Sequence, residues 1–183
     1  MLVEDAQREV RTVYAGGFFG QLVSGAIWLI SAGLATWASP RAAIVELVVC
    51  GFFIHPVTQL LLRVAGRRAS LCRENPLRNL AIQLAFGLLL SMLLLAPVTA
   101  YHLQWFYPAL MILVGAHYLP FTFLYGMRMF LPLAGILIGG GVAIAEFLPN
   151  KLSPGAWITG ITLLVFAGVG RAVAARESDR KAD

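Results

Sequence analysis

Residues 77–101 read LRNLAIQLAFGLLLSMLLLAPVTAY, and this stretch decides the fold. Arg78 is its one charged residue, and most of the other side chains are apolar. About 20 mainly apolar residues in an α-helix are enough to cross the hydrocarbon core of a bilayer. The stretch therefore predicts a transmembrane helix.

Five further stretches have the same character, so we predict an all-α fold. It is an integral membrane bundle of six transmembrane helices forming a single domain over residues 1–183. The composition agrees, because 59% of the chain is hydrophobic and 13% is charged, whereas a soluble domain carries about a quarter of charged residues. The predicted helices cover about residues 12–38, 41–65, 77–101, 104–127, 129–148 and 154–174.

The basic residues predict how the bundle is oriented. Twelve of the 14 Lys and Arg residues fall on one side if the N-terminus is inside, and such an excess marks the cytoplasmic side. Both termini are then cytoplasmic, with residues 175–183 as a polar tail. The predicted cytoplasmic cations are Arg8, Arg11, Arg63, Arg67, Arg68, Arg73, Arg78, Arg128, Arg171, Arg176, Arg180 and Lys181.

Two further features fit this orientation. Trp37, Trp105 and Trp157 all fall near the outer ends of their helices, as expected for an aromatic belt at the membrane interface. The basic residues behind the net charge of +5 lie between apolar stretches, which favours contact with anionic lipid headgroups over nucleic-acid binding.

Residues 1–11 have apolar residues at helical spacing, which predicts an interfacial helix.

Polar groups at membrane depth are costly, so they mark candidate functional positions. His55 and His117 fall at similar predicted depth in helices that run in the same direction. Each is followed by a proline, Pro56 or Pro120, which predicts a kink in both helices.

Glu46 and Glu146 form a second pair, near the outer ends of two helices. With the histidines they predict a polar path that suits a transporter or a channel-like protein for a small solute or ion. Glutamines extend this path toward the inner side, at Gln21, Gln59 and Gln83. The alternative is a non-catalytic scaffold, assembly partner or lipid-interacting protein.

Other chemistry finds little support in the sequence. The predicted spans contain no aspartate, and the chain has no Gly-x-Ser-x-Gly, HExxH or P-loop motif, so we predict no catalytic residue and no metal site. We also expect no cofactor. One cofactor alternative stays open, because His55 and His117 at equal depth are the ligand pair that a b-type haem needs.

Small residues predict close helix packing. Gly16, Gly20 and Ser24 recur every four residues, a spacing that serves packing within the chain or a homo-oligomer contact. Gly139, Gly140 and Gly141 are consecutive, and they predict either packing or a local helix break.

Several segments resemble a family of uncharacterised small bacterial polytopic membrane proteins. The resemblance rests on residues 16–25, GGFFGQLVSG, on Trp28, on residues 74–77, ENPL, on residues 105–108, WFYP, and on residues 115–120, GAHYLP. It implies the plasma membrane of a bacterium and brings no known activity and no functional residues.

Overall fold

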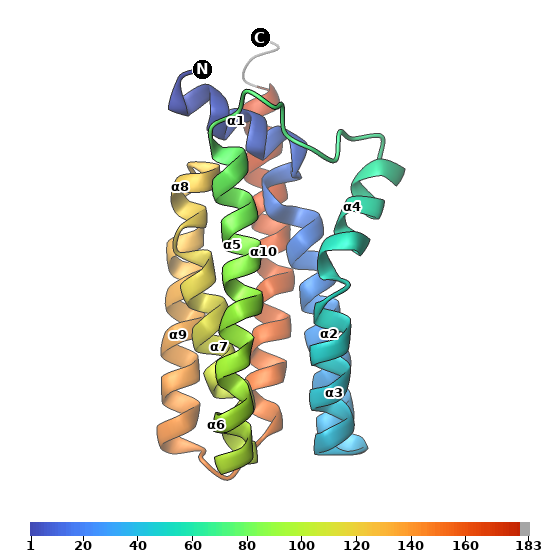
Figure 1. Cartoon of the computed structure of the whole chain (residues 1–183), viewed down its shortest axis with the longest axis vertical. Helices are drawn as coiled ribbons and strands as arrows, with labels where there is room; N and C mark the ends of the chain where they lie inside the picture. Colours follow the sequence, from blue (N-terminus) through green and yellow to red (C-terminus); the bar gives the residue numbers. More distant parts are fainter. Residues whose placement is uncertain (180–183) are drawn as a thin grey trace.

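The computed structural model describes the backbone of residues 1–179 and the side chains of residues 1–175. All regular structure in this part of the chain is helical, which confirms the predicted all-α fold. The helices stand side by side as a bundle (Figure 1). The side chains of Arg176, Arg180 and Lys181 lie outside the described residues.

The structure has a helix or a broken helix at each of the six predicted positions. Five helical stretches are long and apolar enough to cross a membrane, and a bent pair makes a sixth. The main helices are α2 (Phe18–Trp37), α3 (Pro40–Gly51), α4 (Ile54–Val64), α5 (Leu77–Ser91), α6 (Leu95–Tyr101), α7 (Phe106–Tyr118), α8 (Phe121–Tyr125), α9 (Phe130–Phe147) and α10 (Ser153–Asp179).

Both predicted proline breaks are present. Proline cannot donate to the carbonyl four residues earlier, and its ring crowds that carbonyl. Pro56 thereby interrupts the second span, so that α3 and α4 meet at an angle of 54°. Pro120 likewise separates α7 from α8. The three consecutive glycines do not break their helix, because α9 is continuous over Phe130–Phe147.

Two helix pairs form the core, α2 with α10 and α7 with α9. At the first, Gly16 and Gly170 bring their backbones together, and a β-carbon on Gly170 would lie 2.6 Å from the Gly16 carbonyl oxygen. At the second, Gly141 lets α9 approach the Pro108 carbonyl of α7. Gly16, Gly170 and Gly141 therefore serve packing within the chain, whereas a β-carbon on Gly20 would meet no other atom within 4 Å.

The N-terminal segment folds as α1 (Val3–Val13), which lies across one end of the bundle (Figure 1). Its apolar side is buried at Ala6, Val10 and Val13. Positive φ angles at residues 15–17 turn the chain from α1 into α2. The predicted interfacial helix is thus an amphipathic helix that packs on the bundle.

Hydrogen bonds fix α1 to its neighbours. Glu9 accepts from the Cys72 backbone N–H at 2.6 Å and from Asn75 Nδ2 at 2.8 Å. On the other side, Gln7 donates to the Phe123 carbonyl at 2.6 Å and Arg11 to the Tyr125 carbonyl at 2.6 Å. The helix is therefore held by both the α4–α5 loop and the end of α8.

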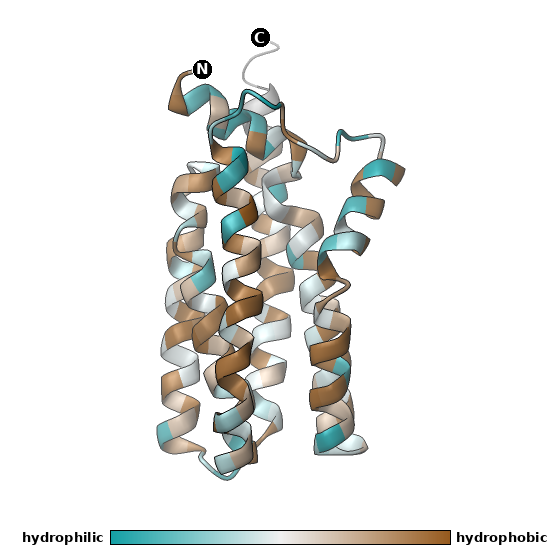
Figure 2. Cartoon of the chain, in the orientation of Figure 1, coloured by the Kyte–Doolittle hydropathy of each residue, from teal (hydrophilic) through white to brown (hydrophobic). Residues whose placement is uncertain are grey.

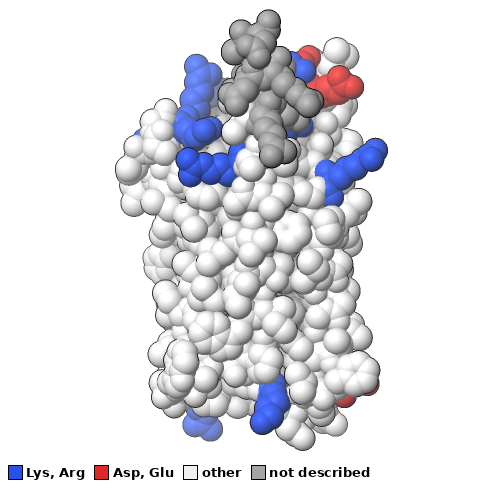
Figure 3. Space-filling model, turned by 180° about the vertical axis from the view of Figure 1, so that it is seen from behind, with Lys and Arg blue, Asp and Glu red and all other residues white. Residues whose placement is uncertain are grey.

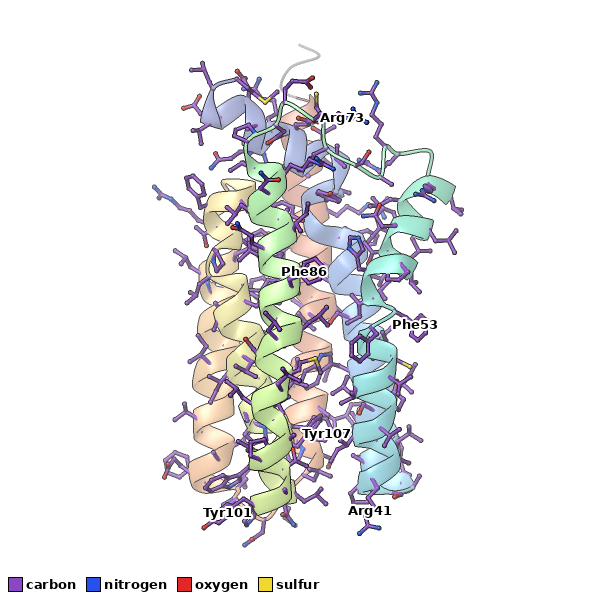
Figure 4. The ribbon with its side chains drawn as sticks, in the orientation of Figure 1. Arg41, Phe53, Arg73, Phe86, Tyr101 and Tyr107 are labelled. Carbon is purple, nitrogen blue, oxygen red and sulfur yellow. The ribbon has the colours of Figure 1, made fainter. Side chains whose placement is uncertain are left out.

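Charged residues gather at the two ends of the bundle and leave an apolar belt between them (Figure 3). The hydropathy colouring shows the same division, with the polar loops above and below brown helical surface (Figure 2). Arg73 and Arg41 mark opposite ends (Figure 4). Trp37 and Trp157 contact each other at the Arg41 end, with ring centroids 5.7 Å apart.

Candidate functional site

The structure separates the four residues of the predicted polar path. His55 is exposed on α4, and Glu146 is exposed near the end of α9. His117 is half-buried on α7, where its ring contacts Phe121 at 4.8 Å and its imidazole faces the backbone of Leu84 in α5. Glu46 is half-buried on α3. No hydrogen bond or ion pair joins any two of these four described side chains.

The two histidines also lie in different surroundings. His55 belongs to α4, which packs on α2, whereas His117 belongs to α7 and faces α5. They therefore do not form the facing ligand pair that a haem bound from both sides needs.

A different set of polar residues does converge. Gln21, Ser24, Trp28 and Ser31 follow one another on α2 at intervals of three and four residues, so they share one face of the helix. All four are buried, with exposed fractions of 2%, 8%, 2% and 0%. We call this set the α2 polar stripe; from Gln21 to Ser31 it covers about 15 Å, roughly half the hydrocarbon thickness.

At its end nearer Arg41 the stripe is tied to two other helices through Ser31. The Ser31 hydroxyl donates to the Ala43 carbonyl of α3 at 2.8 Å. Its oxygen lies 2.7 Å from the hydroxyl of Tyr107 on α7, which is fully buried. Because Ser31 has one proton, and that proton is directed at Ala43, Tyr107 is the donor.

Glu46 lies beside this hydrogen-bonded chain. Both of its carboxyl oxygens are shielded from solvent, and neither makes a hydrogen bond of normal geometry. Its polar neighbours are Ser31 and Cys50. At the other end of the stripe, both amide atoms of Gln21 are also buried without a hydrogen-bond partner. Buried polar groups are normally paired. Among the described residues Thr58, Thr99, His102 and Thr122 also carry one such buried atom, whereas Gln21 and Glu46 each carry two and lie at or beside the α2 polar stripe.

The break between α3 and α4 begins at Phe52, two residues after Cys50. Backbone bonds there are of the short, three-residue kind, from Phe52 N–H to the Val49 carbonyl at 3.2 Å and from Phe53 N–H to the Cys50 carbonyl at 2.9 Å. Glu46 is thus close to an irregular stretch of backbone, where a helix can change its bend without unfolding.

The arrangement combines groups that donate and accept hydrogen bonds. It offers a carboxyl group, an amide, hydroxyl groups and a thiol, all at membrane depth. Among the described residues, no group of three His, Cys, Asp or Glu side chains is placed to hold a metal ion. The sequence predicts Glu46 and Gln21 as path residues and does not single out Ser31 or Tyr107. The spacing of polar residues along α2 could have indicated Ser31.

The fold defines the class of protein: a multi-pass α-helical membrane protein. The chain belongs to a family of unknown function, DUF7010, whose model matches residues 3–171. This match confirms the resemblance to an uncharacterised family. No curated protein and no solved structure matches the chain.

Proposed function

We propose that the protein is a small transporter or channel-like protein for a small solute or ion, and that the α2 polar stripe and Glu46 line its path. The observation that carries the proposal is a pair of groups whose buried polar atoms lack a hydrogen bond of normal geometry: Gln21 at one end of this stripe, and Glu46 of α3 beside Ser31 at the other.

The energetic cost of these groups supports a role beyond packing. An unpaired buried amide or carboxyl costs about 1–3 kcal/mol or more relative to a paired one. Apolar residues of similar size would avoid this cost inside a membrane bundle. A ligand or water passing along the stripe would supply the missing partners, and Glu46 could also take up and release a proton.

The broken helix supports movement at the same place. Transporters often build their sites from discontinuous helices at membrane depth. Here the α3–α4 break begins six residues, nearly two turns, after Glu46, so a change in the 54° bend would move the carboxyl group relative to Ser31. The bend is therefore the proposed moving part.

The proposed setting is the plasma membrane of a bacterium, with the α1 end in the cytoplasm. Nine arginines with described side chains lie at that end, against Arg41 and Lys151 at the other. An excess of basic residues is typical of the cytoplasmic side, where anionic headgroups are available as partners.

Proton movement in proteoliposomes tests the proposal. Purified protein is reconstituted with a trapped pH dye, and flux is recorded under a potassium diffusion potential, alone and with pools of amino acids, sugars and metal cations. We expect movement above that of protein-free liposomes, abolished by Glu46→Gln. Glu146→Gln is the matched control, because it makes the same change at an exposed position, and it should keep the flux. Equal flux in wild type and Glu46→Gln would overturn the role of Glu46.

One observation favours the alternative of a scaffold or assembly partner. In the apolar part of the span formed by α5 and α6, only 6% of the residues are buried within the chain, against 28–44% for four of the other spans. Such a surface suits docking of another chain. This alternative would be favoured if no solute pool produced flux and the protein formed a stable complex with another chain in the membrane.

A further inference from the structure

The break between α3 and α4 lies on the outside of the bundle. Phe52 and Phe53 are 59% and 57% exposed, and His55 and Pro56 next to them are exposed as well. Pro56 has no N–H, so the Phe52 carbonyl lacks its helical donor. Irregular backbone at membrane depth is tolerated only where protein or water covers it, because lipid tails cannot hydrogen-bond. Something polar must therefore cover this break.

Another surface of the same chain carries a hydrogen-bonding group that could cover such a break. Helix α5 is exposed over most of its length, including Phe86 at 62% and Leu90 at 65%. Two exposed amides lie on this helix, Asn79 near its end and Gln83 further along it; Gln83 has both donors and an acceptor available. Like the His55 imidazole, this amide would face hydrocarbon in an isolated chain.

The two polar groups lie at similar depth. Gln83 is six residues from Leu77 at the inner end of α5, about 9 Å along the helix. His55 is eight residues from Arg63 at the inner end of α4, about 12 Å along a helix that is tilted and so reaches less deep. Both therefore fall in the inner half of the membrane.

Within one chain these two helices stay apart. Helix α4 packs on α2 and α5 packs on α7, and α4 leans away from the bundle (Figure 1). Phe53 at the break and Phe86 on α5 lie on the two sides of this open face (Figure 4). One chain thus exposes both halves of a complementary contact, as a twofold dimer requires.

We propose that this α4–α5 face binds a second copy of the chain, so that Gln83 of each copy covers the helix break of the other beside His55. The twofold arrangement forms the contact twice. It places the dimer on a different surface from Gly16, which is used inside the chain.

Disulfide trapping in the membrane tests the contact. In a background without native thiols, made by Cys50→Ala and Cys72→Ser, two differently tagged chains carry His55→Cys and Gln83→Cys. A disulfide forms only when the two α-carbons come within about 7 Å. We expect a reducible band containing both tags. His55→Cys paired with Ile136→Cys, an exposed position on α9, is the control and should give no band.

Absence of the mixed band overturns the proposal, as does a band of equal strength in the control. Trapping through Gly20→Cys in its place would assign the dimer to α2 and also overturns it. Dimer dissociation gives a second readout, by energy transfer between labelled chains diluted in lipid. His55→Leu with Gln83→Leu leaves the fold intact, because leucine suits lipid, and should weaken dimerisation about tenfold. An unchanged dissociation constant contradicts the contact.

Discussion

Tyr107 donates a hydrogen bond of 2.7 Å to Ser31, and Ser31 in turn donates one of 2.8 Å to the Ala43 carbonyl. Two side chains thereby connect α7, α2 and α3 in the half of the bundle nearer Arg41. The same chain of hydroxyls passes beside Glu46, so it holds the proposed site together.

Replacing Tyr107 by Phe should loosen this connection. The change removes one hydrogen bond and leaves the second acceptor site of Ser31 unused, at a cost of about 0.5–1.5 kcal/mol. We expect a lower midpoint of thermal unfolding in detergent. Tyr101→Phe makes the same change on an 81% exposed ring and should leave the midpoint unaltered. Equal midpoints for all three proteins would argue against the bond.

The contact between Gly16 and Gly170 should be intolerant of any side chain. Alanine normally stabilises a helix interior by about 1 kcal/mol relative to glycine. At Gly170 its β-carbon would meet the Gly16 carbonyl oxygen at 2.6 Å, so we expect Gly170→Ala to lower the unfolding midpoint. Gly168→Ala lies two residues away in open space and should be neutral or stabilising. A Gly170→Ala protein as stable as the Gly168→Ala protein would contradict the packing of α2 on α10.

Asn75 should control whether α1 stays attached. Its side chain is 3% exposed and bonds the Ala6 carbonyl at 3.1 Å, Glu9 at 2.8 Å and the Leu77 N–H at 2.9 Å. We expect Asn75→Ala to speed hydrogen exchange over residues 3–13, measured by mass spectrometry. Asn79→Ala, at an exposed position on α5, is the control. Exchange that stays slow in Asn75→Ala would show that α1 is held by other contacts.

The orientation of the bundle can be tested with Cys72, which is exposed in the α4–α5 loop. In a Cys50→Ala background, a membrane-impermeant maleimide should label Cys72 in inside-out vesicles and not in intact bacterial cells. Asn150→Cys, in a chain that also lacks Cys72, should give the opposite pattern, because residue 150 lies at the other end. Labelling of Cys72 from outside would reverse the proposed topology.

The architecture was predictable from the sequence because lipid imposes simple rules. A long uncharged stretch such as residues 80–101 has few alternatives to a spanning helix. Pro56 and Pro120 also placed the two breaks, since a missing donor acts locally. The glycines at 139–141 were compatible with either a helix break or close packing, and in the structure they form a continuous helix that packs against α7.

The site was only partly predictable, because depth along a helix says nothing about direction around it. His55 and His117 match in depth, yet one faces outward on α4 and the other packs against α5. Ser31 and Tyr107 meet across 76 positions of sequence, and no local pattern specifies that contact. The sequence predicts Glu46 only as a carboxyl near a helix end, because its neighbour Ser31 is brought to it by the packing of α2 on α3.

Accessibility of the α2 polar stripe to a charged thiol reagent tests the central claim most directly. In a background lacking Cys50 and Cys72, Ser24→Cys and Ser31→Cys each exchange one small polar group for another, and Ala26→Cys places a thiol on the exposed side of the same helix. If the stripe lines a path, a membrane-impermeant methanethiosulfonate should modify the two stripe thiols in liposomes and leave the Ala26→Cys thiol unreacted in lipid. Stripe thiols as unreactive as the Ala26→Cys thiol from both sides of the membrane would contradict a path along α2.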